Sequence, residues 1–472
     1  MNSNIKVALV QPNCREGPAT GGYVHKAVPP LGLCYLSAVL KQNSIPVDII
    51  DANALDLSPE QVAEKAKGYN IVGVSLLSPV YKFGIKLANL LPKNIIKVAG
   101  NAHATGFWKD TLENGFDIVG IGEGEYTLLD IAQGKALEEI NGIAYKDGKG
   151  EIHLNSPRPL VNPDVIPFPD RGALLNNGMD NPYLSFMTMK TPFAPIFTSR
   201  GCPYNCYFCN KLIFGRTWRP RSAENVIAEI EELVTKYHVK EIDIADDAFN
   251  VNLERAKKIC DMIIENKWKI IIRCTNGIRA NFVDEEFLEK MKKAGCNYIA
   301  YGVESGNQGV LDKIPKGESL EEIERAFELT KKAGIKTAAF IIFGLEGDNE
   351  KTMQDTIDFT FKRLKPNYAS ISIMTPYPGT KLYEKVKKEG KFVENEDWVN
   401  FSHTNPKMLF EHPDFPSPEL TEKMFKKAFK EFYLNPRFIL RNIILIRSWF
   451  DLKQSLEGLK AIKNVLKKRN GK

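Results

Sequence analysis

A chain of 472 residues is too long for one ordinary domain, so we expect two or three. Apolar residues make up 43% of the chain and charged residues 26%, which is typical of a soluble globular protein. The net charge is +6, but the tail from Pro436 to Lys472 carries ten basic and two acidic side chains, so its +8 leaves −2 for the rest. A nearly neutral body argues against a general nucleic-acid-binding surface.

Cysteine use and the N-terminus bear on the compartment. Of the eight cysteines, five stand alone, which predicts no disulfide framework and therefore a reducing compartment. The first residues run straight into a strand-like segment, without the charged and apolar regions of a signal peptide. No uninterrupted apolar run reaches membrane-spanning length. We therefore expect a cytoplasmic protein.

Short runs rich in Ile and Val alternate with helical patterns over residues 1–145. The expected strands are 5–12, 47–52, 71–78, 95–100 and 117–122, and the expected helices are 30–44, 61–69, 82–91 and 126–133. This alternation predicts an α/β fold with a parallel, doubly wound, Rossmann-like sheet, in which ligands bind at the carboxyl ends of the strands. Small or polar residues stand at those ends: Ser75, Ser78, Gly100, Asn101, His103, Gly122 and Glu123.

Residues 146–194 change in character. A hairpin-type turn at Asp147–Gly150 is followed by a stretch dense in proline. Because proline lacks the backbone donor that regular structure needs, this stretch favours an interdomain linker.

From residue 195 to 395 the alternation resumes with longer units. The expected strands are 195–199, 241–245, 270–275, 298–302, 338–343 and 369–374, and the expected helices are 223–236, 253–266, 285–293, 320–332, 351–363 and 381–388. Six βα units are fewer than the eight of a closed barrel. The sequence therefore predicts a partial, open (βα)6 barrel of the TIM type, with its site at the carboxyl ends of the strands.

Residues 396–472 are helical in pattern and rich in Phe, Trp, Leu and Lys, but they indicate no standard fold. The basic tail from Pro436 mixes Ile, Phe and Trp with Arg. Such a helix fits peripheral contact with an anionic membrane surface. The alternative, which we favour, is a helical cap on the barrel with a solvated basic face.

The most informative segment is Thr198–Asn210, TSRGCPYNCYFCN, which follows the first expected barrel strand. Its cysteines, Cys202, Cys206 and Cys209, have the spacing C-x3-C-x2-C. Three thiolates can ligate three irons of a [4Fe-4S] cluster, and with no fourth cysteine nearby one iron stays open for chemistry. Structural zinc is disfavoured because it needs four ligands, and the nearest histidine, His238, is distant in sequence.

This segment resembles the signature of the radical S-adenosylmethionine (SAM) superfamily, in which an aromatic residue, here Phe208, precedes the third cysteine. The resemblance implies that Cys202, Cys206 and Cys209 hold the cluster and that its open iron binds SAM. One electron from the cluster would then release a 5′-deoxyadenosyl radical, which needs a low-potential donor; iron–sulfur potentials reach about −700 mV. Phe208 would pack on the flat cofactor or, alternatively, in the protein core.

Three later strand ends match the same superfamily. Asp246 closes the second strand, a position that faces the cofactor in similar proteins; helix capping is the alternative. Glu304 and Ser305 end the fourth strand, where a carboxylate binds the ribose diol; a buried ion pair is the alternative. Gly344, in the fifth-strand motif, would let the backbone approach adenine, or would simply serve a turn.

The N-terminal region resembles the cobalamin-binding domain that is fused to many radical SAM enzymes, through PPLGLCYLSAVL, VDIIDAN, AGNAHAT and GEGEYTLLD. The resemblance places the cofactor at the strand ends, against Ser75, Gly100, Asn101, His103, Gly122 and Glu123. No D-x-H-x-x-G motif marks a histidine as the lower cobalt ligand, and Ala99-Gly100 replaces the usual double glycine. The alternative is a vestigial domain in which His103 is a loop hydrogen-bonder.

Together the resemblances imply a cobalamin-dependent radical SAM enzyme that methylates an unactivated carbon through a 5′-deoxyadenosyl radical and methylcobalamin. The alternatives are a radical cyclase, oxidase or C–C coupling enzyme and, in another class, a non-catalytic iron–sulfur or cobalamin carrier. The implied partners are a small-molecule or lipid-like substrate and an electron donor such as flavodoxin or ferredoxin, with no nucleic acid. The expected domains are residues 1–145 (cobalamin-binding), 146–194 (linker), 195–395 (barrel) and 396–472 (helical region).

Overall fold

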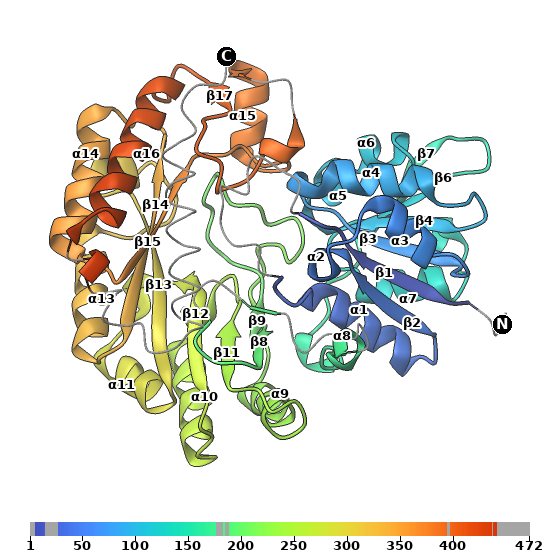
Figure 1. Cartoon of the computed structure of the whole chain (residues 1–472), viewed down its shortest axis with the longest axis horizontal. Helices are drawn as coiled ribbons and strands as arrows, with labels where there is room; N and C mark the ends of the chain where they lie inside the picture. Colours follow the sequence, from blue (N-terminus) through green and yellow to red (C-terminus); the bar gives the residue numbers. More distant parts are fainter. Residues whose placement is uncertain are drawn as a thin grey trace.

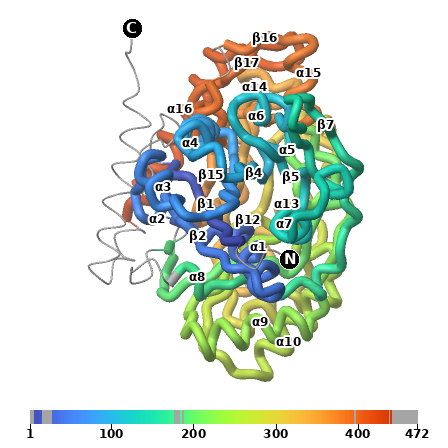
Figure 2. The backbone as a smooth tube through the Cα atoms, turned by 90° about the vertical axis from the view of Figure 1, so that its right-hand side faces the viewer, coloured from blue at the N-terminus to red at the C-terminus, as the bar shows by residue number. Residues whose placement is uncertain are grey.

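The computed structural model describes residues 5–14, 27–175, 183–184, 188–393, 397–436 and 438–440. They form two α/β lobes side by side: an N-terminal lobe of residues 5–154, at the right of Figure 1, and a barrel lobe of residues 188–440, at the left. The turned view in Figure 2 brings the N-terminal lobe in front of the barrel lobe. The expected basic tail lies outside the described residues from position 441 onward, so its role stays a prediction.

The N-terminal lobe contains a seven-stranded sheet in the order β2-β1-β3-β4-β5-β6-β7. Strands β1 to β5 are parallel, and β6 and β7 add antiparallel pairs at one edge. The bounds are β1 (Val7–Gln11), β2 (Val47–Asp51), β3 (Ile71–Ser75), β4 (Ile96–Gly100), β5 (Ile118–Gly120), β6 (Ile143–Lys146) and β7 (Ile152–Leu154). The predicted doubly wound sheet is confirmed, and its last hairpin reaches into the region expected as a linker.

Helices cover both faces of this sheet. They are α1 (Leu31–Gln42), α2 (Ala52–Leu55), α3 (Pro59–Lys65), α4 (Tyr81–Leu90), α5 (Asn101–Gly106), α6 (Trp108–Glu113) and α7 (Glu125–Ala132). Alternate residues of β1 enter two separate cores: Val7 and Leu9 pack on one face, Ala8 and Val10 on the other. Burial on both faces explains why the sequence of β1 is a continuous run of apolar residues. The short helices α2, α5 and α6 were not among those expected.

The barrel lobe contains six parallel strands in the order β8-β11-β12-β13-β14-β15. The strands are β8 (Phe193–Ile196), β11 (Glu241–Ile244), β12 (Ile271–Ile278), β13 (Cys296–Glu304), β14 (Lys336–Phe343) and β15 (Tyr368–Ile373). The helices are α8 (Gly172–Leu175) before the barrel, then α9 (Ala223–Thr235), α10 (Leu253–Glu265), α11 (Glu285–Lys293), α12 (Gln308–Leu311), α13 (Leu320–Lys332), α14 (Glu350–Asp358) and α15 (Lys381–Glu389). Since β8 and β15 end the order without pairing, the barrel is open, as predicted.

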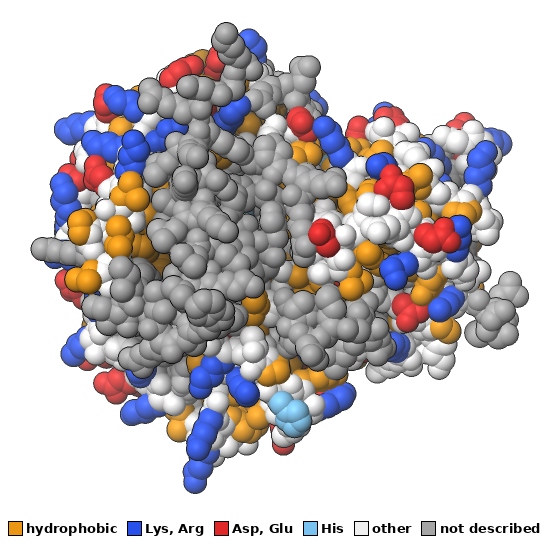
Figure 3. Space-filling model, in the orientation of Figure 1, with side chains coloured by type: hydrophobic (Ala, Val, Ile, Leu, Met, Phe, Trp, Pro, Cys, Tyr) orange, Lys and Arg blue, Asp and Glu red, His pale blue; other side chains and the backbone are white. Residues whose placement is uncertain are grey.

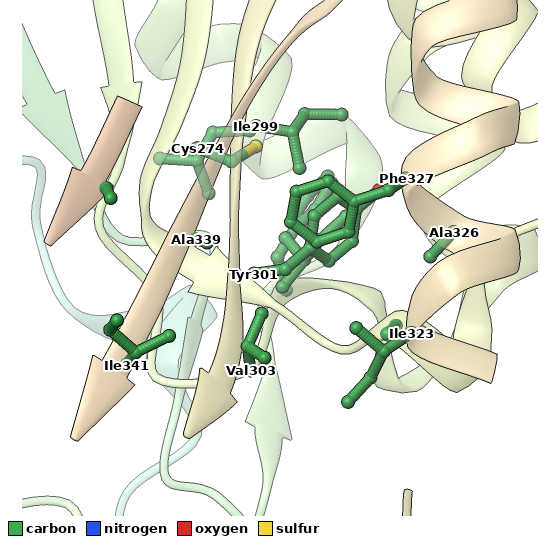
Figure 4. Packing of buried hydrophobic residues seen from close by; sticks show 14 of the residues in the cluster. Cys274, Ile299, Tyr301, Val303, Ile323, Ala326, Phe327, Ala339 and Ile341 are labelled. Atoms are coloured by element: carbon green, nitrogen blue, oxygen red, sulfur yellow. The ribbon is translucent and has the colours of Figure 1, made fainter. Parts of the chain in front are cut away.

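Tyr301 on β13 shows how the outer helices hold these strands. Its ring lies 5.2 Å from that of Phe327 on α13, and its hydroxyl oxygen is 2.7 Å from that of Thr330. Around them pack Cys274, Ile299, Val303, Ile323, Ala326, Ala339 and Ile341 (Figure 4). Close packing of this kind fixes the strands, so their carboxyl ends present loops in a defined geometry.

A buried ion pair occupies the inside of the barrel near the amino ends of the strands. Arg273 on β12 donates from Nη1 to Glu241 Oε1 at 2.7 Å, and its guanidinium lies 5.2 Å from the centre of the Tyr298 ring. Glu241 is the first residue of β11. A site in this lobe therefore belongs to the opposite end of the strands.

The described C-terminal residues pack on the barrel lobe. β16 (Lys391–Phe392) and β17 (Phe410–Glu411) pair antiparallel, and α16 (Pro418–Tyr433) contacts β14, β15 and α14. Among the helices in the described ranges, none has the length and apolarity needed to cross a bilayer. Basic and acidic side chains are interspersed on the described part of the face in Figure 3, in keeping with the nearly neutral body.

Candidate functional site

The three cysteines lie on one closed loop at the carboxyl end of the first barrel strand. The short strands β9 (Ser199–Arg200) and β10 (Arg219–Pro220) pair antiparallel, so residues 201–218 form a cysteine loop that is joined at its base. Gly201 begins this loop with a φ of +81°, and a Cβ there would lie 2.4 Å from the Thr217 carbonyl oxygen. Glycine is therefore required for closure of the loop.

The thiols differ in exposure: Cys202 and Cys206 are partly buried, and Cys209 is exposed. Loss of solvation among the surrounding protein atoms raises the pKa of the Cys206 thiol, and it raises the pKa of Cys209 to about 12. Both thiols therefore keep their protons until a metal centre displaces them.

The spread of the three thiols bears on the kind of metal centre that they can hold. Within the described residues, one group of three or more possible ligands has donor atoms that all lie within 4.8 Å of one another, and it consists of Asp147, Glu151 and His153 on the β6–β7 hairpin. The three cysteine sulfurs do not form such a group, so at least two of them lie more than 4.8 Å apart. Three thiolates with this separation fit ligands on different irons of a [4Fe-4S] cluster.

Tyr204, between the first two cysteines, connects the cysteine loop to the residues after β12. The Arg279 guanidinium lies 3.6 Å from the centre of the Tyr204 ring, which is a cation–π contact. Arg279 also donates from Nη2 to the Lys316 carbonyl oxygen at 2.6 Å, and its Nε is 3.4 Å from Glu318 Oε1. The cysteine loop is thereby joined to the segment that carries Lys316.

Glu304 stands at the carboxyl end of β13 with a φ of +59°, which is uncommon for a residue other than glycine. Its Oε1 lies 3.0 Å from Lys316 Nζ, which is also 3.0 Å from Glu318 Oε2. Desolvation opposes a charge on Lys316, but Glu304 and Glu318 outweigh it and raise the pKa of the amine. The ion pair weighed as an alternative is present, and Oε2 of Glu304 keeps no hydrogen-bond partner in the described part of the chain.

Ser305 is used inside the protein. It is completely buried, its Oγ accepts a hydrogen bond from the Asn307 backbone at 3.2 Å, and it lies 3.3 Å from the Thr356 hydroxyl. These contacts stabilise the turn after β13, and the expected cofactor contact of Ser305 stays a prediction.

Asp246 also has partners within the protein. Its carboxylate accepts hydrogen bonds from the Thr198 backbone and hydroxyl, both at 2.5 Å, and from the Ser199 hydroxyl at 2.6 Å. The buried carboxylate therefore supports the strand that leads into the cysteine loop and does not face open space. The protein atoms around the carboxylate of its neighbour Asp247, together with the charge of Asp246, raise the pKa of Asp247 to about 6.

Gly344 and Phe208 both have contacts within the protein, and their expected cofactor contacts stay predictions. Gly344 has a φ of +84°, and a Cβ there would lie 3.1 Å from the Thr421 methyl group on α16 and 3.5 Å from Met408 Sδ. Its glycine is explained by the turn and by the approach of the C-terminal helix. Phe208 packs against the barrel core and makes an edge contact with Tyr207 at 5.4 Å between ring centres.

Four of the predicted residues of the N-terminal lobe gather at the carboxyl ends of β3 and β4. Asn101 has a φ of +79° and donates from Nδ2 to the Ser75 hydroxyl at 2.9 Å. Gly100 immediately precedes α5, and a side chain there would meet no atom within 4 Å. The fourth residue, His103, lies within α5. Polar groups and open space are thus combined at the edge where a doubly wound sheet binds ligands.

The His103 ring points into the protein. It is buried, its Nδ1 lies 3.0 Å from the Ser78 hydroxyl, and burial lowers the pKa of the imidazole to about 4. Its ring packs against Tyr81, Phe107 and Trp398 at centre distances of 4.4, 5.4 and 5.0 Å. A neutral, enclosed imidazole supports the loop-hydrogen-bonder alternative.

Leu77, which the sequence analysis missed, projects from the same edge. It follows β3, and its side chain is 45% exposed, whereas Leu76 is completely buried. A large apolar side chain beside the hydroxyls of Ser75 and Ser78 fits a ligand with an apolar ring system and polar substituents, as cobalamin has. The signal in the sequence was two consecutive leucines after a strand, since only one of them can point into the core.

Glu123 and Gly122 contact the barrel lobe. The carboxylate of Glu123, which follows β5, pairs with Arg200 at 2.7 Å and with Arg219. Gly122 has a φ of +78°, and a Cβ there would lie 3.7 Å from the Ile213 carbonyl oxygen. Both contacts fall on residues 200–219, so the ligand edge of the N-terminal sheet faces the cysteine loop.

Family comparisons match both lobes. Residues 196–360 match the radical SAM superfamily, and residues 19–132 match the B12 binding domain. An uncharacterized methyltransferase of Pyrococcus horikoshii is 32% identical over 469 residues, which cover 96% of this chain and 98% of the relative. The chain therefore belongs to the radical SAM superfamily, in the group that carries a B12 binding domain.

Other relatives extend the comparison. An anaerobic magnesium-protoporphyrin IX monomethyl ester cyclase of Rubrivivax gelatinosus is 28% identical and covers 92% of this chain and 78% of the relative. The structure of the methyltransferase TsrM from Kitasatospora setae, with cobalamin and a [4Fe-4S] cluster bound, superposes with a TM-score of 0.70 at 16% identity, covering 97% and 98% of the two chains. The radical enzyme OxsB gives a TM-score of 0.72 at 18% identity, covering 97% of this chain and 72% of OxsB.

These findings confirm the predicted family and fold class. They also confirm, at the level of the two domains, an enzyme that uses a [4Fe-4S] cluster, SAM and cobalamin. Which residues contact each cofactor stays a prediction.

Proposed function

We propose that this protein is a cobalamin-dependent radical SAM methyltransferase that adds a methyl group to an unactivated carbon. The observation that carries the proposal is that the cysteine loop and the ligand edge of the N-terminal sheet face each other, joined by the contacts of Glu123 and Gly122. Two cofactors held at these edges would share one space. Relatives named as methyltransferases support it, among them a cytidylyl-2-hydroxyethylphosphonate methyltransferase of Streptomyces wedmorensis, 27% identical over 78% of this chain and 79% of the relative.

The proposal assigns roles to the three cysteines, to Glu304 and to Lys316. Cys202, Cys206 and Cys209 hold the cluster, and the cofactors, when bound, supply reductive cleavage of the sulfonium and a carrier for the methyl group. Oε2 of Glu304 accepts a hydrogen bond from a hydroxyl group of the SAM ribose. Lys316, 3.0 Å from Oε1, fixes the direction of that carboxylate.

The substrate side of the proposal is coarser. We propose a small-molecule substrate, which enters between the lobes, and a flavodoxin or ferredoxin as electron donor. The proposed domains remain residues 1–145, 146–194, 195–395 and 396–472. A crystal structure of TsrM contains tryptophan as substrate, which is an example of a small molecule on this fold.

A second candidate is radical oxidation or cyclisation without net methylation. The observation that favours it is the cyclase relative, which matches this chain over 92% of its length. The two candidates share the cluster and the radical and differ in the fate of the methyl group.

One anaerobic experiment tests the proposal. The reconstituted protein is reduced and given SAM and hydroxocobalamin, and 5′-deoxyadenosine and S-adenosylhomocysteine are quantified. Methyl transfer predicts both products, the cyclase candidate predicts 5′-deoxyadenosine alone, and a carrier gives neither. Cys206→Ala, which removes one iron ligand, is expected to abolish both; a Cys206→Ala protein with unchanged products would refute the site.

A further inference from the structure

The base of the cysteine loop is attached to the other lobe through two carboxylates, Glu123 and Glu125, of which Glu123 contacts both strands of the base. In the β9–β10 pair, Arg200 lies directly opposite Arg219. Both arginines bind Glu123 of the N-terminal lobe: Arg200 Nη1 is 2.7 Å from Oε2, and Arg219 Nη2 contacts Oε1. The two ends of the loop that carries the cluster ligands therefore meet at a single side chain from the cobalamin-binding lobe.

The surroundings of Arg200 make this attachment rigid. The guanidinium is 3% exposed, and its Nη2 donates to Glu125 at 2.6 Å. The rings of Tyr35 and Phe214, one from each lobe, lie 5.0 and 5.1 Å from it. With two carboxylates and two aromatic faces around it, the planar guanidinium has one orientation that satisfies all its partners.

A contribution to stability alone does not account for this group of buried charges around Arg200. A buried ion pair loses in desolvation much of what it gains in attraction, so it contributes geometry more dependably than free energy. The lobes already share apolar contacts at Phe107, Trp398 and Tyr383, which hold them together without charge. The attachment at Glu123 lies at the paired strands β9 and β10, where the cysteine loop begins and ends.

We propose that Glu123 is a positioning residue that fixes the cysteine loop, and with it the cluster and its SAM, at one distance and angle from the cobalamin edge. The inference rests on the proposed function. In the transfer that the proposed function requires, the C–S bond of the sulfonium would break with its electron pair left on S-adenosylhomocysteine, and cobalamin, when bound and reduced, would supply the electron pair of the new bond to the methyl group. In-line transfer is sensitive to displacements of about 1 Å, whereas electron transfer within the cluster–SAM pair depends only on the barrel lobe.

The test uses the full-length, reconstituted protein with Glu123→Gln, which keeps the shape of the side chain and removes its charge. With SAM, reductant and hydroxocobalamin, we expect S-adenosylhomocysteine formation to fall about tenfold or more, while 5′-deoxyadenosine formation stays within about twofold. A second readout is the EPR spectrum of bound cob(II)alamin with the cluster oxidised and then reduced. We expect the magnetic coupling between the two centres to be weaker in the variant, or its effect on the EPR signal to be spread over a broader range.

Matched variants separate positioning from simple docking. Asp397→Asn removes an ion pair to Lys82 that also joins the lobes but is exposed, at 64% and 41% for the two side chains, and it is expected to change neither readout. Arg219→Lys, which keeps the charge but loses the forked contact, is expected to give an intermediate effect.

Three results would overturn the inference. A Glu123→Gln protein with wild-type product ratio and EPR coupling would show that the contact positions nothing. Loss of iron and sulfide from Glu123→Gln and Arg219→Lys alike would show that the contact only stabilises the loop. Wild-type protein that forms 5′-deoxyadenosine but neither binds cobalamin nor makes S-adenosylhomocysteine would refute the proposed function itself, and the inference with it.

Discussion

The guanidinium of Arg279 lies over the ring of Tyr204, 3.6 Å from its centre, and so joins the cysteine loop to the residues that follow β12. Arg279 in turn donates to the backbone of Lys316, whose amine holds Glu304. The loop that carries the cluster ligands and the carboxylate proposed to bind SAM are thus connected through three side chains. We therefore expect the order of the cysteine loop to depend on the order of the Glu304 side chain, and the reverse.

Removing the Tyr204 ring tests this connection. A cation–π contact that is largely shielded from water contributes about 0.5–2 kcal/mol. We expect Tyr204→Leu to lose iron to a chelator about tenfold faster than the wild type, whereas Tyr204→Phe, which keeps the ring, behaves as the wild type. Equal rates of iron loss for the two variants would contradict the role assigned to the ring.

Glycines within the cysteine loop offer a second test. Gly201 and Gly215 both have positive φ values, +81° and +71°, but only at Gly201 would a Cβ meet neighbouring atoms. Gly215→Ala should cost about 1–2 kcal/mol of backbone strain. Gly201→Ala adds a contact of 2.4 Å with a carbonyl oxygen, so it is expected to lower the iron content after reconstitution well below that of Gly215→Ala. Matching iron contents would show that the closure of the loop is not required.

Leu77 is expected to contact bound cobalamin. Leu77→Asp places a charge at the ligand edge of the N-terminal sheet, and we expect it to weaken hydroxocobalamin binding about tenfold or more in equilibrium dialysis, since desolvating a carboxylate is unfavourable. Leu90→Asp is the matched control, because Leu90 is 44% exposed, against 45% for Leu77, and ends α4, away from the ligand edge. Binding that is weakened equally by both substitutions would place cobalamin elsewhere.

His103 predicts a pH dependence of stability. Burial lowers its pKa to about 4 in the folded protein, from 6.5. Between these values the unfolded chain binds a proton that the folded protein does not, so the stabilisation is fully present above about pH 6.5 and is lost as the pH falls toward about 4, by up to about 3 kcal/mol. In His103→Phe this loss should be smaller, as seen in urea midpoints measured at a series of pH values. If the wild type and His103→Phe lose stability equally as the pH falls, burial of His103 is not the cause of the pH dependence.

The strands and the cysteine loop were predictable because their signals are local. The apolar alternation placed every expected strand of both sheets, and the spacing of Cys202, Cys206 and Cys209 defined the loop. The direction of a side chain at a strand end depends on partners far away in the sequence. Asp246 accepts a hydrogen bond from Thr198, and Glu123 pairs with Arg219, and neither partner could be predicted from the sequence.

Gly344 and Ser305 illustrate the same limit. A glycine in a motif can serve close approach of a ligand or of the protein itself, and at Gly344 it is helix α16, more than 70 residues later, that comes close. The Ser305 hydroxyl is taken by Thr356, from the next βα unit. Residue type and spacing restrict the chemistry available at such positions, but only the tertiary contacts select among the alternatives.

The contact of both Arg200 and Arg219 with Glu123 has a consequence for how the cluster is assembled. Both ends of the iron-binding loop gain their anchor only once residues translated more than 75 positions earlier have folded and the halves have come together. Stable binding of iron and sulfide is therefore expected only after the two lobes have come together. A fragment that begins at residue 188 should accumulate as apoprotein even where the assembly machinery is abundant.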